Sequence, residues 1–381
     1  MAARFWLYSH NFTHSGAPLV LASIARELAA AGLREQLRIV SWGGLHDHRH
    51  STLQYELKEN GIKCLVLNPG QSPPKIRSGD RLLLNTVALP DAVIHQAIDW
   101  LRKGKLKRLD WFAHESDPQI WIQSENTRFL ISETLKLGRL QMRVPSKIVL
   151  KIYQKWLDCF NDNLDVQCPA LEPSPSFDNY AIPEKGHFST LRIALVGAVG
   201  YGNKGHLWLL NLLQLALEDA SNQKSSIRPL ELTFLGVEED NRYAALTKKV
   251  VAYGKELLGN KFNYMQISAR DKLLVELQRS NLLVCCSLKE AFSCISSEAL
   301  YMGLPLLRNH TGGSDEQLID GITGFDLGET SSLITPMQID LLQNIRDSNL
   351  TPEKKLINMS INARKHGATF LSIKYTKWLL N

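Results

Sequence analysis

The chain has 381 residues, a hydrophobic content of 44%, a charged content of 22% and a formal net charge of +6. This length favours two domains, and the hydrophobic fraction is ordinary for a globular protein and sufficient for two cores. No apolar run approaches the ~20 residues of a membrane span, and residues 1–10 lack the apolar segment of a signal peptide. The 6 cysteines show no C-x-x-C spacing, so we expect reduced thiols in a cytoplasmic protein.

The basic excess lies in the first part of the chain. Residues 1–170 contain 22 basic and 16 acidic side chains, a difference of +6, whereas the remaining 22 and 22 balance. Part of this excess is concentrated between Arg102 and Arg108. A solvated helix end is the better interpretation of that cluster; the other is a contact with an anionic acceptor or with the inner face of an anionic membrane. We expect no nucleic-acid partner, because the sequence has no basic stripe interleaved with aromatic residues.

Short apolar runs alternate with helical patterns through the first half. Residues 4–8 predict a strand, and a loop that contains Gly16 leads from it into a helix over residues 19–31. Strand, glycine-containing loop and helix form the opening of a Rossmann-type unit, in which ligands bind at the carboxyl ends of the strands. Further strands are predicted at residues 37–42, 64–67, 81–85 and 109–113. This rhythm indicates a parallel sheet.

Three histidines, His46, His48 and His50, alternate in one loop and resemble a metal-binding pattern. No matching cysteine or second histidine pair accompanies them, so a solvated loop is the better interpretation. We therefore expect no bound metal.

The end of the first half carries the other features of interest. His114 directly follows the strand at residues 109–113, and Ser146 is placed to cap a helix over residues 147–156. The segment after it is rich in proline and serine and has no periodicity. We predict a first domain over residues 1–170 and a linker over residues 171–190.

The second half opens with a predicted strand at residues 191–196, a glycine-containing loop and a helix from His206. The loop glycines, Gly200 among them, let backbone N–H groups approach a phosphate, and Lys204 adds a positive charge. A glycine follows Lys204, so the loop is not a P-loop, and it does not match the G-x-G-x-x-G dinucleotide fingerprint. Taken alone, the loop leaves its ligand open.

Residues 280–326 form the stretch around which the rest of the chain is organised. A short apolar run at residues 282–286 suits a strand that is buried on both faces. Ser293 is placed to cap a helix that stops at Gly303, and a second strand follows at residues 304–307. The pair Gly312-Gly313, then Glu316 and the turn signal Asp320-Gly-Ile-Thr-Gly324 complete the stretch.

Two carboxylates flank the start of the helix that Ser293 caps. Glu290 lies in the loop before it and Glu298 lies within it. The helix N-terminus between them offers free N–H groups and a positive dipole end, which suit a phosphate. Carboxylates on either side suit hydroxyl-rich groups such as ribose and a sugar. The order predicts a nucleotide sugar, although two solvated acids would explain the pair if it stood alone.

In this context, the string of strand, Glu-x-Phe-Ser, helical Glu, Gly-Leu-Pro, Gly-Gly-x-x-Glu and Asp-Gly-x-x-Gly resembles the donor-binding half of retaining glycosyltransferases of family 4, or group 1. The resemblance is close over residues 190–330. It implies an α/β chain with two Rossmann-like domains facing a central cleft, the GT-B fold. It also implies a donor-side domain over residues 191–364 and a last helix over residues 365–381 that packs back on the first domain.

The resemblance assigns roles to individual residues. Lys204 would hold the donor diphosphate, Glu298 the ribose and Glu290 the sugar hydroxyls, while His114 would contact the sugar from the first domain. We thus predict His114, Glu290 and Lys204 as catalytic residues. The predicted donor-binding residues are Gly16, Gly200, Lys204, Glu290, Phe292, Ser293, Cys294 and Glu298. The base would be read by backbone groups of the strand at residues 262–267.

One departure weakens the match. Members of the family commonly place an arginine directly after the first glycine of the loop, where this chain has Ala198. One cationic contact to the diphosphate is therefore missing or supplied from elsewhere, and Arg270 and Arg279 are unsupported candidates.

The expected reaction is transfer of a sugar, with retention, from a nucleotide-diphosphate sugar to a hydroxyl of a glycan, lipid-linked or small-molecule acceptor, as in polysaccharide biosynthesis. The donor is a co-substrate, and neither a cofactor nor a metal is expected. Two alternatives stay open: a nucleotide-sugar epimerase on the same fold, and a non-catalytic binding subunit. A dehydrogenase fits less well, because the glycine pattern is wrong.

Overall fold

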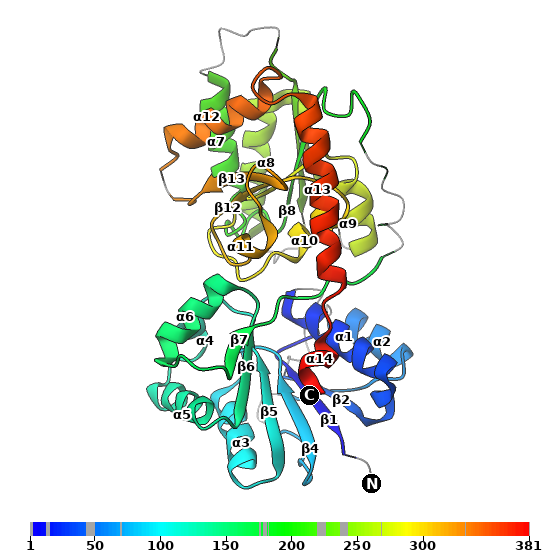
Figure 1. The fold of residues 1–381 in the computed structure, drawn as a ribbon, viewed down its shortest axis with the longest axis vertical. Helices are drawn as coiled ribbons and strands as arrows, with labels where there is room; N and C mark the ends of the chain where they lie inside the picture. Colours follow the sequence, from blue (N-terminus) through cyan, green and yellow to red (C-terminus); the bar gives the residue numbers. More distant parts are fainter. Residues whose placement is uncertain are drawn as a thin grey trace. The chain divides into compact units, whose positions relative to one another are not determined.

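The structure is a computed structural model that describes residues 3–12, 16–42, 50–68, 71–174, 177, 181, 183–218, 226–236, 243–267, 269–331 and 333–380. The chain forms two compact units, shown in Figure 1. The first unit comprises Met1–Ala170 with Ile373–Asn381, and the second comprises Leu171–Ser372.

The first unit is built on a seven-stranded parallel sheet with the strand order β3-β2-β1-β4-β5-β6-β7. The strands are β1 (Phe5–Ser9), β2 (Leu37–Ser41), β3 (Lys63–Val66), β4 (Asp80–Leu84), β5 (Leu106–Phe112), β6 (Leu140–Val144) and β7 (Leu164–Val166). The helices are α1 (Gly16–Leu28), α2 (His50–Glu59), α3 (Asp91–Arg102), α4 (Pro118–Trp121), α5 (Glu125–Lys136), α6 (Lys147–Leu157) and α14 (Tyr375–Leu379). This strand order is that of a doubly wound Rossmann sheet.

The predicted strands of the first half all form, with ends shifted by up to three residues. Their continuous apolar runs are explained by burial on both faces: β1 is buried at every position, whereas the edge strand β3 is buried at none. Ser146 caps α6 as predicted, since its side chain accepts a hydrogen bond from the Val149 N–H at 3.3 Å. Strand β7 is too short, at three residues, for its pattern to have been recognised.

Helix α1 belongs to the core of the first unit. The stretch Gly16–Gln36 is long and apolar enough to cross a membrane by length and composition alone. In the structure, however, Leu21, Ile24 and Leu28 on α1 are buried and pack with strand residues in one hydrophobic cluster. Core helices of globular proteins pass the same compositional test.

The basic cluster is partly used within the first unit. The Lys103 ammonium forms an exposed ion pair with Asp99 at 2.8 Å, and Arg108 forms one with the buried carboxylate of Asp110 at 3.0 Å. Arg108 Nη2 also donates to Leu379 O at 3.0 Å. The loop with His46 and His48 lies outside the described residues, as does the His50 side chain.

The C-terminal segment differs from the single helix expected over residues 365–381. Helix α13 (Glu353–Leu371) ends in the second unit with Ser372 as its C-cap, and a separate helix, α14, begins at Tyr375 in the first unit. The Glu27 carboxylate of α1 caps α14: it accepts from the N–H groups of Tyr375 and Thr376 at 3.1 and 2.8 Å. An acid at the first turn satisfies N–H groups that have no partner in the helix.

We predict that Glu27→Ala loosens α14, because it removes both acceptors at the helix start. The loss of a cap costs about 1 kcal/mol, so the amides of Tyr375 and Thr376 should exchange with solvent roughly fivefold to tenfold faster. Hydrogen exchange measures this directly. The exposed Glu59→Ala is the matched control, and equal exchange rates in the two variants would show that the Glu27 cap does not hold the helix.

The second unit repeats the doubly wound order with six parallel strands, β10-β9-β8-β11-β12-β13. The strands are β8 (Leu191–Val196), β9 (Leu230–Gly236), β10 (Phe262–Gln266), β11 (Leu282–Cys285), β12 (Leu306–Asn309) and β13 (Gly324–Gly328). The helices are α7 (His206–Glu218), α8 (Ala244–Leu258), α9 (Arg270–Leu277), α10 (Cys294–Tyr301), α11 (Ser314–Gln317), α12 (Pro336–Arg346) and α13. Two parallel-sheet α/β domains are therefore present, as predicted.

Residues 171–190, expected to be a linker, are assigned to the second unit. The Leu171 N–H donates to Phe370 O at 3.0 Å, and Phe188 is buried in the core of this unit. Glu353 accepts from the N–H groups of Gly186 and Phe188 at 2.7 and 3.1 Å. The described residues of the segment are thus held by separate contacts with the second unit, which explains their lack of periodicity.

Candidate functional site

The second sheet has a switch in strand order between β8 and β11. In doubly wound sheets, the crevice outside the carboxyl ends of the two strands at such a switch is where ligands bind. The loop after β8 carries Lys204, and the loop after β11 carries Glu290. The topology therefore brings together two residues that lie 86 positions apart in the sequence.

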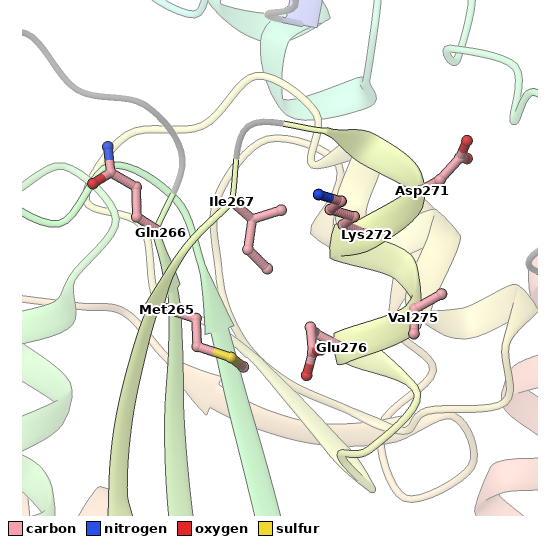
Figure 2. A pocket seen from close by; sticks show the side chains of 7 residues that line it. All are labelled: Met265, Gln266, Ile267, Asp271, Lys272, Val275 and Glu276. Atoms are coloured by element: carbon pink, nitrogen blue, oxygen red, sulfur yellow. The ribbon is translucent and has the colours of Figure 1, made fainter.

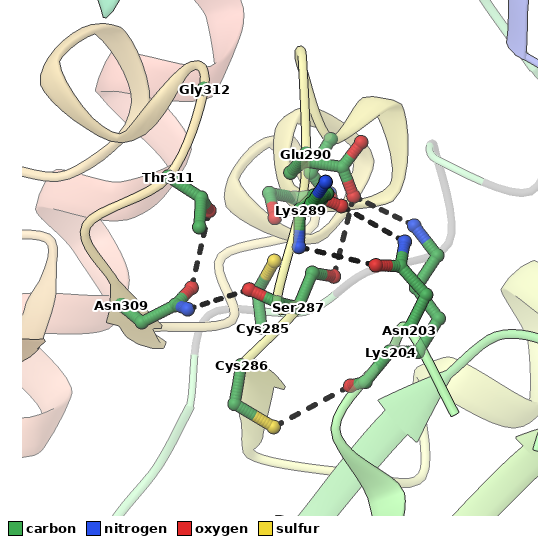
Figure 3. Close-up of polar contacts among 12 residues, drawn as sticks. Asn203, Lys204, Cys285, Cys286, Ser287, Lys289, Glu290, Asn309, Thr311 and Gly312 are labelled. Carbon is green, nitrogen blue, oxygen red and sulfur yellow. Dashed lines mark hydrogen bonds and ion pairs between the residues drawn. The ribbon is translucent and has the colours of Figure 1, made fainter. Parts of the chain in front are cut away.

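Lys204 and Glu290 form a close ion pair, drawn in Figure 3. Lys204 Nζ donates to Glu290 Oε2 at 2.7 Å, and Ser287 Oγ reaches the same oxygen at 3.4 Å. Asn203 fastens the two loops: its Nδ2 donates to Lys289 O at 2.9 Å, and its Oδ1 accepts from the Lys289 N–H at 3.1 Å.

Two glycines allow the loops to approach this closely. A Cβ on Gly205 would lie 2.3 Å from Cys286 O, and a Cβ on Gly312 would lie 2.3 Å from Glu290 O. Both contacts are with backbone atoms, which cannot turn away. Gly205 also has a φ of +78°, which a residue with a side chain rarely adopts. The Gly312 N–H donates to Glu290 O at 3.1 Å and so holds the Gly312-Gly313 turn against the loop.

Helix α10 begins between the two acids, as predicted. Ser293 is its N-cap, and its side chain accepts from the Ser296 N–H at 3.4 Å. Cys294 is the first helical residue, and Gly303, with a φ of +79°, follows the C-cap. Phe292 is buried against Phe370, with ring centroids 5.9 Å apart, and so packs into the unit.

Glu298 has a cationic partner that the sequence did not reveal. Arg270, at the start of α9, donates to Glu298 Oε1 from Nε at 2.8 Å and from Nη2 at 2.5 Å. Glu298 and Cys294 are four residues apart and share one face of α10. The helix start therefore has one ion pair at Glu290 and another at Glu298.

The surroundings shift the pKa values of the two acids in opposite directions. Burial alone would raise the pKa of Glu290, but the Lys204 ammonium and its hydrogen bond, with the Arg308 guanidinium, lower this pKa. Burial raises the pKa of Glu298, and Arg270 only partly offsets it. Glu290 is thus held firmly ionised, and the pKa of Lys204 is raised because the carboxylate outweighs its burial.

Two other residues considered from the sequence make contacts elsewhere in the second unit. Gly200 packs against the start of α8: a Cβ there would lie 2.5 Å from both Tyr243 O and Thr247 Oγ1. Its small size is explained by that packing. Arg279, one of the two candidates to replace the cation missing at Ala198, is exposed and pairs with Glu276 at 2.7 Å.

The remaining predicted residues, Gly16 and His114, lie in the first unit. Asn85 forms hydrogen bonds with His114 and with Ala17, the residue after Gly16. Gly16 is the first residue of α1, and Asn85 Nδ2 donates to Ala17 O at 2.8 Å. His114 Nε2 lies 3.1 Å from Asn85 Oδ1, and the ring stacks 4.0 Å from Phe112. Since the amide nitrogen of Asn85 is committed to a carbonyl, its oxygen must accept, and His114 Nε2 carries the proton.

Burial, followed by the neighbouring His10, lowers the pKa of His114 to about 3. The imidazole is therefore neutral at physiological pH, with a proton on Nε2 and a lone pair on Nδ1. Such a ring can accept a hydrogen bond from a hydroxyl, but it is a poor proton donor.

We predict that His114 stays neutral in the folded protein down to pH 5. The unfolded chain takes up a proton below about pH 6.5, so this residue makes stability fall as pH falls from there toward 3. Nuclear magnetic resonance of the ring nitrogens, with His114→Gln to identify the signals, measures the titration. A midpoint near 6.5 would contradict the lowered pKa of His114.

A pocket of about 550 Å³ lies beside the end of β10. Figure 2 shows its lining side chains, which come from β10, the residue after it and α9. They are Met265, Gln266, Ile267, Asp271, Lys272, Val275 and Glu276. None of the predicted catalytic or donor-binding residues lines it, although Arg270 adjoins Asp271 in the sequence.

Comparison with known proteins identifies the class of this fold. HepE from Anabaena in complex with UDP and glucose matches with a TM-score of 0.68 at 15% identity, over 98% of this chain and 97% of that chain. Sucrose-phosphate synthase from Thermosynechococcus elongatus matches with a TM-score of 0.68 at 15% identity, over 100% and 97%. WaaG, a glycosyltransferase involved in lipopolysaccharide biosynthesis, matches with a TM-score of 0.59 at 16% identity, over 97% of each chain. The chain has the GT-B fold.

The family follows from the sequence of the second unit. Residues 185–366 match the family model of glycosyl transferases group 1. The match covers residues 280–326, so the resemblance seen there is confirmed. No curated protein matches the sequence. Glycosyl transfer is the activity that the family and the fold support.

Proposed function

We propose that the protein is a retaining glycosyltransferase that moves a sugar from a nucleotide-diphosphate sugar to an acceptor hydroxyl without a bound metal. The observation that carries the proposal is the position of Lys204 and Glu290, which form an ion pair at the strand-order switch of the second sheet, with the α10 N-terminus four residues after Glu290. Lys204 and the α10 N-terminus are both sources of positive charge, and both suit a diphosphate.

Departure of the diphosphate is the step that this charge assists. As the glycosidic bond to the phosphate breaks, negative charge grows on the diphosphate oxygens. N–H groups of α10 and the Lys204 ammonium, already fixed in place, stabilise that charge more than they stabilise the bound donor. Glu290 holds the Lys204 ammonium in place through one hydrogen bond of 2.7 Å. The ammonium has two further N–H groups, which can donate to the phosphate.

The acids bind neutral parts of the donor. Glu298 accepts both Arg270 bonds through Oε1, so its Oε2 is available for the ribose diol. Glu290 Oε2 accepts from Lys204, and the carboxylate, which also interacts with the Ala291 N–H, has further lone pairs to accept hydrogen bonds from sugar hydroxyls. His114, neutral and with a lone pair on Nδ1, accepts a hydrogen bond from a sugar hydroxyl. We name no protein nucleophile.

Structural neighbours suggest the first substrates to test. HepE is seen with UDP-glucose, and WaaG is involved in lipopolysaccharide biosynthesis. We therefore place UDP sugars first among donors, and glycan or lipid-linked hydroxyls first among acceptors. Incubation with a labelled donor and each acceptor, followed by nuclear magnetic resonance of the product, tests retention. An inverted anomer would contradict it, and transfer that is abolished by a chelator would contradict metal independence.

A thermal-shift screen against UDP, GDP, ADP, TDP and CMP tests donor binding. A nucleotide at 100 times its Kd should stabilise the folded protein by about 2.7 kcal/mol. We expect one diphosphate to stabilise the chain more than the others and more than its own nucleoside. No shift with any of them would contradict the proposed function.

We predict that Lys204→Ala weakens binding of that diphosphate by roughly tenfold to a hundredfold, because it removes a charge-assisted contact of about 1.5–3 kcal/mol. Isothermal titration calorimetry gives the Kd. The exposed Lys248→Ala on α8 changes the net charge equally and serves as the control. Glu298→Gln should weaken binding of the nucleotide but not of inorganic pyrophosphate, which has no ribose. If both ligands were weakened alike, Glu298 would not be the ribose ligand.

A further inference from the structure

The second core contains a charged side chain to which the proposed function gives no role. Arg308, on β12, has an exposed fraction of 0%. Its Nη1 donates to Ser296 Oγ at 3.0 Å and to Cys285 Sγ at 3.2 Å, and its Nη2 donates to Gly312 O at 2.6 Å. The guanidinium therefore lies between the first turn of α10 and the Gly312-Gly313 turn.

A buried guanidinium is costly unless a carboxylate neutralises it. The three partners of Arg308 are neutral, its Nε has no partner, and in the described part of the chain no carboxylate lies within 4.0 Å. The other buried residues of this strand are uncharged: Leu306 and Leu307 are apolar, and the Asn309 amide donates to Ser287 O at 2.7 Å. A charged side chain that is buried without a carboxylate partner costs folding free energy, and such residues are expected at functional sites.

Hydrogen-bond chemistry gives the contact with Ser296 a direction. A guanidinium can only donate, so Ser296 Oγ accepts from Arg308, and the Ser296 O–H donates a hydrogen bond to Ser293 Oγ at 2.9 Å. Ser293 Oγ also accepts the Ser296 N–H. The Ser293 hydroxyl proton has no acceptor among the described residues. Each bond polarises the next, so the relay ends in a strengthened donor at the N-cap of α10.

We propose that Arg308 replaces, from beneath the helix, the cation that is missing at Ala198, and that the relay from Arg308 through Ser296 to Ser293 donates to the diphosphate of the nucleotide sugar. This role rests on the proposed function, because it requires a diphosphate at the start of α10. Arg308 is buried and does not touch the donor, so it is a positioning residue that acts through the two serines. Its effect grows with the negative charge of the ligand.

The test measures Kd values of the full chain for four probes. One probe is inorganic pyrophosphate. The other three are the nucleoside diphosphate that stabilises the protein most in the thermal-shift screen, its nucleoside monophosphate and its nucleoside. The variants are Ser296→Ala, Arg308→Met and Arg308→Lys. Ser297→Ala is the matched control. The Ser297 hydroxyl is next to Ser296 in the sequence, but it accepts from Gln317 Nε2 at 2.7 Å and takes no part in the relay.

We expect Ser296→Ala and Arg308→Met to weaken binding of pyrophosphate and of the diphosphate by about tenfold or more, the monophosphate less, and the nucleoside by less than about twofold. Arg308→Lys, which keeps the charge, should recover part of the loss. Ser297→Ala should bind as the unaltered chain does. With the full reaction, kcat should fall as well as affinity, since the leaving diphosphate is more negative than the bound donor.

Three results would overturn the role of Arg308. One is an equal loss for the nucleoside and the diphosphate, which a merely structural role predicts. Another is a Ser296→Ala variant that binds pyrophosphate as tightly as the unaltered chain does. This variant decides the question even if Arg308→Met fails to fold, which the melting temperature of Arg308→Met would show. The third is an unaltered chain that binds no nucleoside diphosphate, which overturns the proposed function too. If Ser296→Ala and Arg308→Met bind the diphosphate as tightly as the unaltered chain does, the role of Arg308 is overturned and the proposed function stands.

Discussion

The site of the second unit depends on how closely three loops meet at the carboxyl edge of one parallel sheet. Gly205 touches the backbone at Cys286, and Gly312 touches the backbone at Glu290, at distances that leave no room for a Cβ. These contacts place Lys204 within hydrogen-bond distance of Glu290 and next to the start of α10. Positive charge, a helix N-terminus and carboxylates are thereby held at one edge of the sheet, an arrangement that suits electrostatic catalysis.

The charges of the site are mutually compensated in the structure. Lys204 pairs with Glu290, and Arg270 pairs with Glu298, so neither acid is buried without a cation. Such pairing limits the cost of holding ionised groups in a partly dry site. A diphosphate would then enter as a second anion shared by existing cations. Arg308 differs, since its hydrogen bonds go to neutral partners only and the nearby Glu290 carboxylate, which it helps to keep ionised, is shared with Lys204; a bound anion would compensate it further.

The sequence predicted those features that depend on local order along the chain. We could predict the strand β8, the N-cap Ser293 and the helix stop at Gly303, because apolar runs, caps and glycines with positive φ depend on neighbouring residues only. The sequence placed Lys204 and Glu290 in one donor site, but their ion pair was not predicted. Arg270 and Arg308 could not be assigned, because a cation gives no sign in the sequence of which distant acid or helix it will meet. The break at Ser372 was also missed, since nothing local distinguishes one long helix from two that belong to different units.

The most direct measurement is a crystal structure of the full chain with its nucleoside diphosphate. The account predicts phosphate oxygens at about 2.7–3.1 Å from the N–H groups of the first turn of α10 and from Lys204 Nζ. It also predicts a ribose diol on Glu298. A diphosphate bound elsewhere, with Lys204 bonded to Glu290 alone and the start of α10 in contact with water, would contradict it.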